Sequence, residues 1–400
     1  MAGTTGIGTT YALPNYHGEL FAVTPANTPF LSAIGGLTGG KKTTSTAFEW
    51  QTADLRDPVQ PANLEGATAP TAQERVRANV SNVVQIHQST VAVSYTKQAA
   101  VGQYATPSSA PYRTADGAPN PVTNELDWQT MQELKATALD VNYSFINGVK
   151  SVPTTNAAAR KTGGLIEACA SNTVNKGTAL TGASASTDTI TVTHALNNGD
   201  KVVFTDTGGS TAIKANRVYY VVNKSTTVSF KVSETSGGTP ITIGTATVSL
   251  IALWSTTLTV AHVEEFVQQV WDNGGLNGEA ATFIVGSAQK RALTAAYAAE
   301  YGKALPFAGT RNVAGVAVDT VLTDFGTFNI MLDRMVPRDA IIACSLDQCA
   351  PVFLEIPGKG VFFEEQLAKT GASDQVQLYG EIGLQWGNEK AHGVLRGLVA

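Results

Sequence analysis

Two cysteines five positions apart, Cys344 and Cys349, are the residues whose type and spacing come closest to a chemical motif. Paired thiolates can hold zinc, but a structural zinc site needs four ligands. Neither a histidine nor the third cysteine, Cys169, lies nearby in the sequence. An odd, sparse set of cysteines also argues against a disulfide scaffold. The sequence therefore predicts buried thiols that act as small core residues, and no metal site.

A glycine-rich stretch, residues 35–42, nearly matches a phosphate-binding loop. The position after the loop lysine, Lys41, should carry Ser or Thr to hold Mg²⁺, and it carries Lys42 instead. No buried strand precedes the stretch, so the sequence favours a flexible arm at this place.

The histidines also lack a catalytic setting. None lies in an HExxH motif or beside a plausible nucleophile, and no G-x-S-x-G elbow occurs. The five are His17, His87, His194, His262 and His392. We expect His392 to pack in a final strand and His262 to begin a helix. The sequence thus predicts no catalytic residue and no cofactor.

The composition favours a subunit of an assembly. Charged residues make up 15% of the 400 positions, against roughly 25% in a typical soluble domain. A chain with so little charge is expected to have much of its surface covered by neighbours. The net charge is −5 and no basic run occurs, so tight binding to a phosphate backbone is not expected. The first residues lack the pattern of a signal peptide, and no apolar run approaches a membrane span; we expect a protein made in a cytoplasm, without a membrane partner.

The elements that would carry contacts begin with an N-terminal arm, residues 1–45. Two strand-like runs follow, at 45–51 and 76–95, around a polar, proline-bearing stretch. They predict a long two-stranded hairpin (46–97), in which a dozen paired residues would carry the tip about 40 Å from its base. The candidate contacts between subunits are the charged residues of the tip: Arg56, Asp57, Glu65, Glu74, Arg75 and Arg77.

The rest of the chain mixes helices and strands. Apolar residues three or four apart predict an amphipathic helix at 123–148, about 36 Å long; they are Trp128, Met131, Leu134, Ala138, Val141 and Phe145. Short alternating runs with turn signals predict an inserted β-sandwich or barrel at 176–253. Residues 98–175 hold the helix and the start of a mixed body, and residues 254–400 complete that body with further helices and strands.

Three stretches near the end carry a resemblance to a known family: Leu367–Ser373 (LAKTGAS), Tyr379–Leu384 (YGEIGL) and Asn388–Gly393 (NEKAHG). They are similar to the tail of an actinophage and podophage branch of tailed-bacteriophage major capsid proteins, in which an "AKTG…GE…L…NEKAHG" run closes the chain. Thr28–Leu31 (TPFL) resembles the N-terminal helix of that branch. The order of elements also resembles the Hong Kong-type capsid fold. The resemblance covers most of the chain outside 176–253.

The resemblance implies an α+β capsid fold with an N-arm, an E-loop hairpin, a spine helix, P and A domains, and an inserted all-β domain. It implies a virion subunit that assembles with itself into hexamers and pentamers in the host cytoplasm. Portal and scaffolding proteins would be its partners, and the shell would enclose double-stranded DNA without sequence-specific binding. Some relatives cross-link through an E-loop lysine; here no lysine occurs between Lys42 and Lys97, so no cross-link from the hairpin is expected.

Four alternatives stay open on the sequence. An encapsulin-type compartment shell would share the fold and package enzymes. A tail-tube or decoration protein would have the β insert as its main body, and the long helix counts against this alternative. An enzyme would need an acid–base or metal cluster, and none is visible. A secreted β-rich adhesin fits the Thr-rich insert but not the missing signal peptide.

Overall fold

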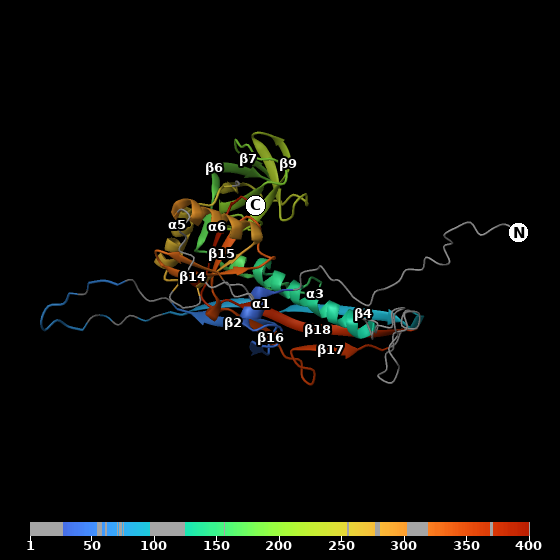
Figure 1. Ribbon diagram of the computed structural model, residues 1–400. Helices are drawn as coiled ribbons and strands as arrows, with labels where there is room; N and C mark the ends of the chain where they lie inside the picture. Colours follow the sequence, from blue (N-terminus) through green and yellow to red (C-terminus); the bar gives the residue numbers. More distant parts are fainter. Residues whose placement is uncertain are drawn as a thin grey trace. The chain divides into compact units, whose positions relative to one another are not determined.

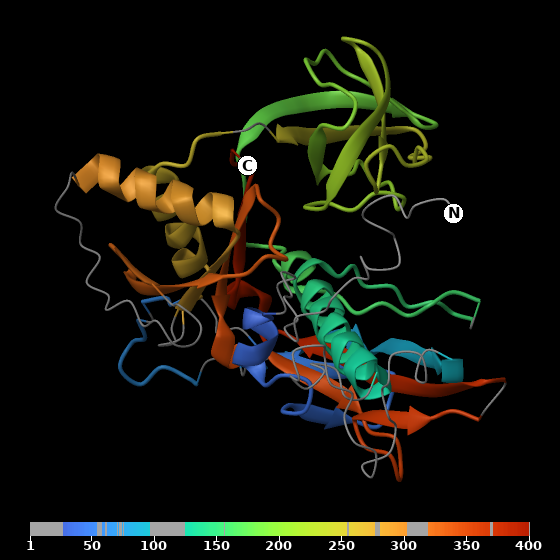
Figure 2. The ribbon, with the colours of Figure 1, turned by 45° about the vertical axis from the view of Figure 1, so that its right-hand side comes forward.

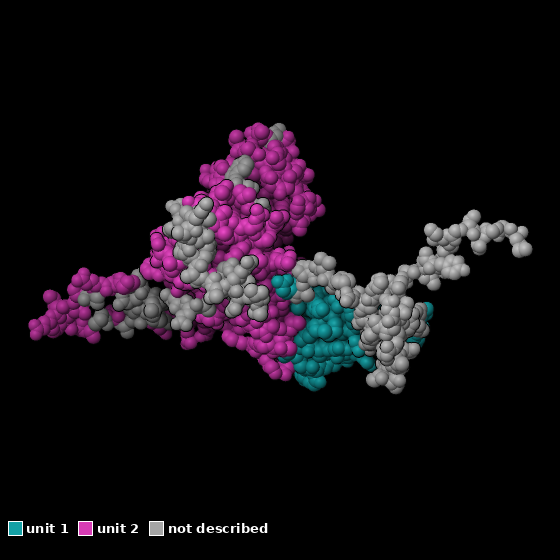
Figure 3. Space-filling model, viewed as in Figure 1, with its two compact units in different colours: residues 1–27, 86–141, 356–381 teal, residues 28–85, 142–355, 382–400 magenta. Residues whose placement is uncertain are grey.

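Many strands and few helices make up the chain, which is an α+β protein (Figure 1). The computed structural model describes residues 27–53, 58–60, 62–69, 71, 74, 76–96, 125–155, 157–253, 256–276, 281–301, 319–368 and 371–399. The chain divides into two compact units, coloured separately in Figure 3. The smaller comprises residues 1–27, 86–141 and 356–381, and the larger comprises 28–85, 142–355 and 382–400.

Strands dominate the smaller unit. β17 (Phe362–Gln366) pairs antiparallel with β18 (Ser373–Gln385), from Phe362↔Gly380 to Gln366↔Val376. β4 (Gln85–Ser94) also pairs with β18. The Phe363 and Tyr379 rings lie 5.7 Å apart between centroids, directly across from one another. Such cross-strand aromatic pairs stabilise a sheet and help to fix its register.

The long helix is α3 (Glu125–Asn147), which contributes residues to both units. Val141 and Phe145 of the predicted apolar face are fully buried, but Met131 is 55% exposed. Two threonines are buried instead, Thr130 and Thr137. Each hydroxyl donates to the main-chain carbonyl four residues earlier, at 2.9 Å. Because that bond satisfies the hydroxyl locally, threonine can face inward here, and the predicted face was wrong at Met131.

A six-stranded sheet forms the centre of the larger unit. Its order is β13 (Asp319–Thr323), β14 (Gly326–Leu332), β12 (Ala281–Val285), β15 (Ala340–Ser345), β19 (Gly393–Arg396) and β5 (Thr173–Asn175). The helices α5 (Val260–Asp272) and α6 (Ser287–Tyr301) lie side by side (Figures 1 and 2). Val263, Phe266 and Val270 of α5 join the core of this sheet, where the Phe283 and Phe328 rings stack at 4.4 Å. The alternating apolar residues of the stretch 314–319 predict a strand, but this stretch lies almost wholly outside the described residues.

A closed barrel occupies residues 177–253, with the strand order β10-β7-β6-β11-β8-β9. The strands are β6 (Gly177–Ser186), β7 (Thr189–Thr191), β8 (Lys201–Asp206), β9 (Val218–Thr226), β10 (Ser229–Ser233) and β11 (Ala246–Leu253). Phe204, Tyr219 and Phe230 are fully buried in a core that belongs to the barrel alone. Gly177 and Leu253 are register partners, so the chain enters and leaves the barrel at neighbouring residues.

Shorter elements complete the larger unit. Near the start, α1 (Pro29–Ile34) is followed by β1 (Lys41–Thr43), which pairs parallel with β16 (Ala350–Leu354). The flexible arm expected at residues 35–42 was therefore wrong: the Gly39 N–H donates to Gly35 O at 3.0 Å, and a strand follows. Gly35 has φ +130°, which only glycine adopts easily, so the glycines serve a tight turn. The remaining short helices are α4 (Leu165–Ala168), η1 (Leu346–Gln348) and η2 (Glu389–Ala391).

The predicted long hairpin is shorter than expected. β2 (Ala47–Thr52) and β3 (Ala78–Val83) form six register pairs, and the second run then breaks at Val84. Val83 and Val84 are both buried, while Ile86 is 46% exposed. Both faces of the chain are therefore covered at the point where the ladder with β2 ends, and β4 takes β18 as its neighbour.

Candidate assembly surface

The candidate assembly surface is the connection between β2 and β3, residues 53–77, which we call the tip loop (blue in Figure 1). Each residue of the tip loop that the structure describes is exposed. The loop combines prolines, alanines and charges, a composition that supplies no core of its own. A segment whose described residues are all exposed is suited to contact a second molecule.

Three large apolar side chains in the tip loop face solvent. Val59 is 64% exposed, Leu64 86% and Val76 87%. Sequence reasoning missed them because it looked for charge at the tip. The available signal was their position: single apolar residues in a polar, proline-bearing stretch have no alternating neighbours with which to form a core. A neighbouring molecule that covered these side chains would remove their apolar surface from water, which makes the tip loop a candidate contact.

Of the charged residues predicted to make contacts, the structure describes three. Glu65 and Glu74 are exposed. Arg77 is exposed as well, and its Nη1 donates to Gln51 Oε1 at 2.9 Å, a bond between the ends of β3 and β2. Arg56, Asp57 and Arg75 lie outside the described residues. The described members are thus placed on one exposed loop, where single charge pairs contribute little to stability.

The base of the hairpin is anchored by Asn82, which is fully buried. Its Nδ2 donates to Leu384 O at 2.7 Å, to Thr162 Oγ1 at 3.0 Å and to Gly163 O at 3.2 Å, and its Oδ1 accepts from Gly163 N at 2.9 Å. The Leu384 N–H donates to Thr162 Oγ1 at 3.3 Å. Both main-chain groups of Leu384 are therefore satisfied by side chains, as a neighbouring strand would otherwise do.

Aromatic packing and a lysine fix the same base. Trp50 Nε1 donates to Gly387 O at 2.7 Å, and the Trp50 and Trp386 rings meet edge to face at 5.1 Å. On β3, Ser81 Oγ accepts from Lys150 Nζ at 2.9 Å. These contacts hold the two strands against the body of the larger unit, so that the tip loop projects from a rigid base.

A cavity of about 470 Å³ lies where the barrel meets the body of the larger unit. Arg396, which is 4% exposed, donates there to Asn216 O at 2.6 Å and to Ile166 O at 3.4 Å. Burial lowers the pKa of Arg396 from its ordinary value. The other charges of the lining form pairs, which are Lys201–Asp339 at 2.9 Å, Lys214–Glu167 at 3.5 Å and Arg217–Glu234 at 3.3 Å. Charged side chains that already form pairs are better suited to hold the barrel on the body than to act as acids or bases.

None of the described helices is long and apolar enough to cross a membrane.

Solved structures of phage shells resemble the chain. The capsid asymmetric unit of Cyanophage A-1(L) matches with a TM-score of 0.56 and 11% identity, over 98% of this chain and 99% of that one. The capsid of Cyanophage P-SCSP1u matches with a TM-score of 0.50 and 12% identity, over 99% and 96%. At such identities the likeness shows the fold, and it confirms the tailed-phage capsid fold predicted from the sequence. No curated protein matches the chain.

A match to a protein-family model shows which family the chain belongs to. The model described as SU10 major capsid protein matches residues 3–399, nearly the whole chain. The predicted resemblance to tailed-phage major capsid proteins is thereby confirmed. The chain is a major capsid protein and belongs to the SU10 major capsid protein family.

Proposed function

We propose that copies of this chain meet head to tail in rings of five and six, and that these rings close into an icosahedral shell around double-stranded DNA. The tip loop is the observation that carries the proposal. Its apolar residues Val59, Leu64 and Val76 stay exposed in the single subunit, while its base is held by Asn82 and Trp50. A rigid base with an apolar end suits insertion onto a neighbouring copy.

The charged residues at the tip would set the register of that contact. We assign this role to Arg56, Asp57, Glu65, Glu74, Arg75 and Arg77. Opposite charges across an interface steer association and exclude wrong registers more than they add affinity. The domain division into arm (1–45), E-loop (46–97), helix and body (98–175), insert (176–253) and closing body (254–400) belongs to the same proposal.

The remaining roles follow from a shell. We propose assembly in the host cytoplasm, with portal and scaffolding proteins as further partners. A net charge of −5 without a basic run suits a wall that encloses DNA without binding its sequence. In this proposal the chain performs no catalytic step and uses no cofactor.

The test compares two serine variants of exposed apolar residues. In the double variant Leu64→Ser/Val76→Ser, we expect a folded subunit with wild-type circular dichroism that no longer forms closed shells in electron microscopy. The control is Val228→Ser in the barrel, where the valine is 45% exposed; it should assemble like the wild type. Shells of normal size and yield from the double variant would contradict the role given to the tip loop.

A further inference from the structure

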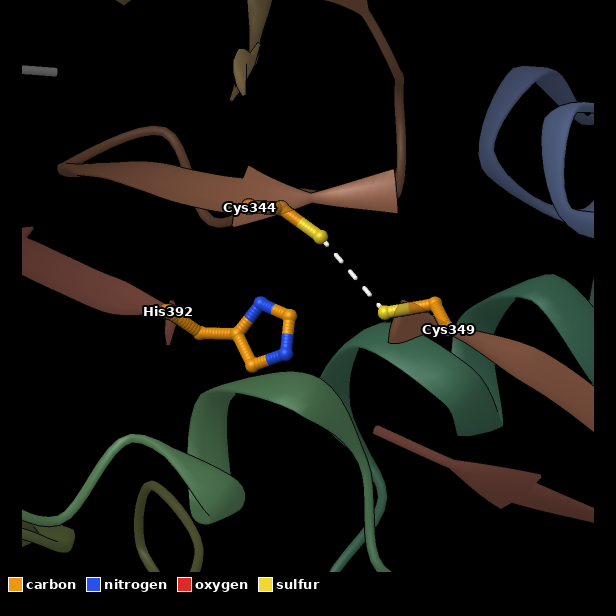
Figure 4. A group of neighbouring side chains, drawn as sticks. All are labelled: Cys344, Cys349 and His392. Carbon is orange, nitrogen blue, oxygen red and sulfur yellow. Dashed lines mark hydrogen bonds between the residues drawn. The ribbon is translucent and has the colours of Figure 1, made fainter. Parts of the chain in front are cut away.

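Three soft donor groups meet inside the larger unit: the thiols of Cys344 and Cys349 and the imidazole of His392 (Figure 4). Their ligating atoms all lie within 4.8 Å of one another, and the two sulfurs are 3.6 Å apart. The side chains are 0%, 6% and 0% exposed. Across the described parts of the chain, no other three histidine, cysteine or acidic side chains are grouped in this way.

The fold, and not the local sequence, makes this cluster. Ala343 of β15 pairs with Gly393 of β19 in antiparallel register. The next pair along would be Cys344 and His392, which places their side chains on one face of the sheet. The short helix η1 then turns the chain back, so that Cys349 follows immediately, before β16. In the sequence, no histidine lies near the two cysteines, and this argued against a metal site. The pairing of β15 with β19 brings a histidine, His392, beside Cys344.

The hydrogen bonds of His392 fix which nitrogen can bind. Its Nε2 lies 2.6 Å from Trp386 O. A carbonyl oxygen only accepts, so Nε2 carries the proton and the lone pair is on Nδ1. The partner of Nδ1 is the Ser345 N–H, at a long 3.4 Å. Histidines that ligate metals commonly donate their other ring N–H to a carbonyl in this manner.

We propose that Cys344, Cys349 and His392 bind one Zn²⁺ ion, which joins β15, β19 and the start of β16. Thiolates at about 2.3 Å from a tetrahedral zinc lie roughly 3.8 Å apart, close to the 3.6 Å between these sulfurs. The described residues supply no fourth ligand within this group, so the proposed site has three protein ligands and an open fourth position, unlike a closed structural zinc site with four.

The charges favour zinc over a monovalent soft ion. Two thiolates and a neutral imidazole around Zn²⁺ sum to zero, whereas the same ligands around Cu⁺ would leave a negative charge in the core, which is costly to bury. Without metal, burial and the neighbouring Cys349 raise the pKa of the Cys344 thiol. Zinc binds the thiolate form of cysteine, so binding releases the proton of each ligating thiol. A sulfur separation of 3.6 Å also excludes a disulfide in this arrangement.

The proposal is independent of assembly, since it concerns the stability of the single subunit. The test uses the full chain, expressed in zinc-supplemented medium, purified in zinc-free buffer and analysed for metal by mass spectrometry. We expect about one zinc ion per chain, and a loss of roughly tenfold or more in Cys349→Ser and in His392→Gln. The matched control is Cys169→Ser, because Cys169 is equally buried but lies outside the cluster; it should keep its zinc.

A variant in the core can fail to fold, so the wild type provides a second measurement. The chain is unfolded under reducing conditions and refolded with ZnCl₂ or with a chelator. We expect the zinc-refolded protein to retain the ion and to melt at a higher temperature, and Co²⁺ in its place to give thiolate charge-transfer absorption that Cys349→Ser lacks. Wild type with no zinc and the same melting temperature in both refolding arms would overturn the proposal. Equal zinc loss in Cys169→Ser and Cys349→Ser would overturn it too.

Discussion

Replacing Asn82 by alanine tests whether this one side chain holds the hairpin base to the body. The substitution removes the donor to Leu384 O, at 2.7 Å, and the acceptor of Gly163 N, at 2.9 Å. Both main-chain groups belong to buried residues. A buried polar group left without a partner costs about 1–3 kcal/mol. Two such groups give an expected loss of about 2–6 kcal/mol in the free energy of unfolding, a large part of the roughly 5–15 kcal/mol of a typical domain.

The assay is urea unfolding of the unassembled chain, followed by tryptophan fluorescence. Trp50 and Trp386 pack against each other at the same base, so their emission reports on this region. At about 2 to 3 kcal/mol per molar urea, the expected loss lowers the unfolding midpoint by roughly 0.7 to 3 M. Asn79→Ala is the matched control, because Asn79 lies on the same strand and is exposed; its midpoint should equal that of the wild type.

A second variant separates the two halves of the network. Asn82→Asp keeps an acceptor for the Gly163 N–H but loses the donors, and it places a carboxylate where its neighbour is the Leu384 carbonyl. We expect it to be no more stable than Asn82→Ala. An Asn82→Ala midpoint within about 0.3 M of the Asn79→Ala midpoint would refute the reasoning, because a loss below about 1 kcal/mol is too small for two unpaired buried groups.

Two further predictions concern acid and backbone strain. Burial lowers the pKa of His87 from 6.5 to about 4, so the unfolded chain binds this proton more tightly. The contribution of His87 to the free energy of unfolding should be constant above pH 6.5, fall between pH 6.5 and 4, and level off below pH 4. His87→Leu should remove about 3 kcal/mol of this fall in the free energy of unfolding. Urea unfolding at pH 7 and at pH 4 measures the difference, and a variant with the pH dependence of the wild type would contradict the prediction. Gly397 has φ +84°, and a Cβ there would lie 1.8 Å from Lys176 O, so Gly397→Ala should lower the free energy of unfolding by at least about 2 kcal/mol, measured by thermal unfolding. The control is Gly371→Ala, whose Cβ would meet open space and should leave the stability unchanged. Equal stability of the two variants would count against the strain at Gly397.

The sequence predicts elements well where a local period encodes them. The helix expected at 123–148 is α3, Glu125–Asn147, because apolar residues three or four apart have one stable arrangement in water. The helix α5 has the same spacing, with Val263, Phe266, Val267 and Val270 buried along one face. The alternating runs of residues 177–253 are strands, since alternation with turn residues between runs leaves one face for a core.

Pairing between distant strands is what the sequence leaves undetermined. β4 takes β18 as its neighbour, nearly three hundred residues away, and no local pattern names that partner. The same holds for His392 beside Cys344, which follows from the register of β15 and β19. Burial of Asn82 could not be predicted either, since its partners, Thr162, Gly163 and Leu384, come from other segments.

The sequence and the structure point to the same segment, the tip loop, but through different residues. Charge is easy to notice in a polar stretch, so the tip loop was described by its Arg and Glu side chains. Its exposed apolar residues, Leu64 and Val76 above all, stand out only when their burial is known. A single apolar residue is ambiguous in a sequence, because either a core or a neighbouring molecule can cover it.

The pairing of Gly177 with Leu253 makes the barrel a replaceable module. Residues paired across antiparallel strands have Cα atoms about 5 Å apart, a gap that a linker of a few residues spans. The body could therefore be connected across the same two positions by a single tight turn in place of the whole barrel. If the barrel were removed, Arg396 of β19 and Asp339 would lose their barrel partners, Asn216 O and Lys201, but a short linker would still close the chain. For the same reason, the junction at 176–177 and 253–256 is a natural place to display a foreign domain on the subunit.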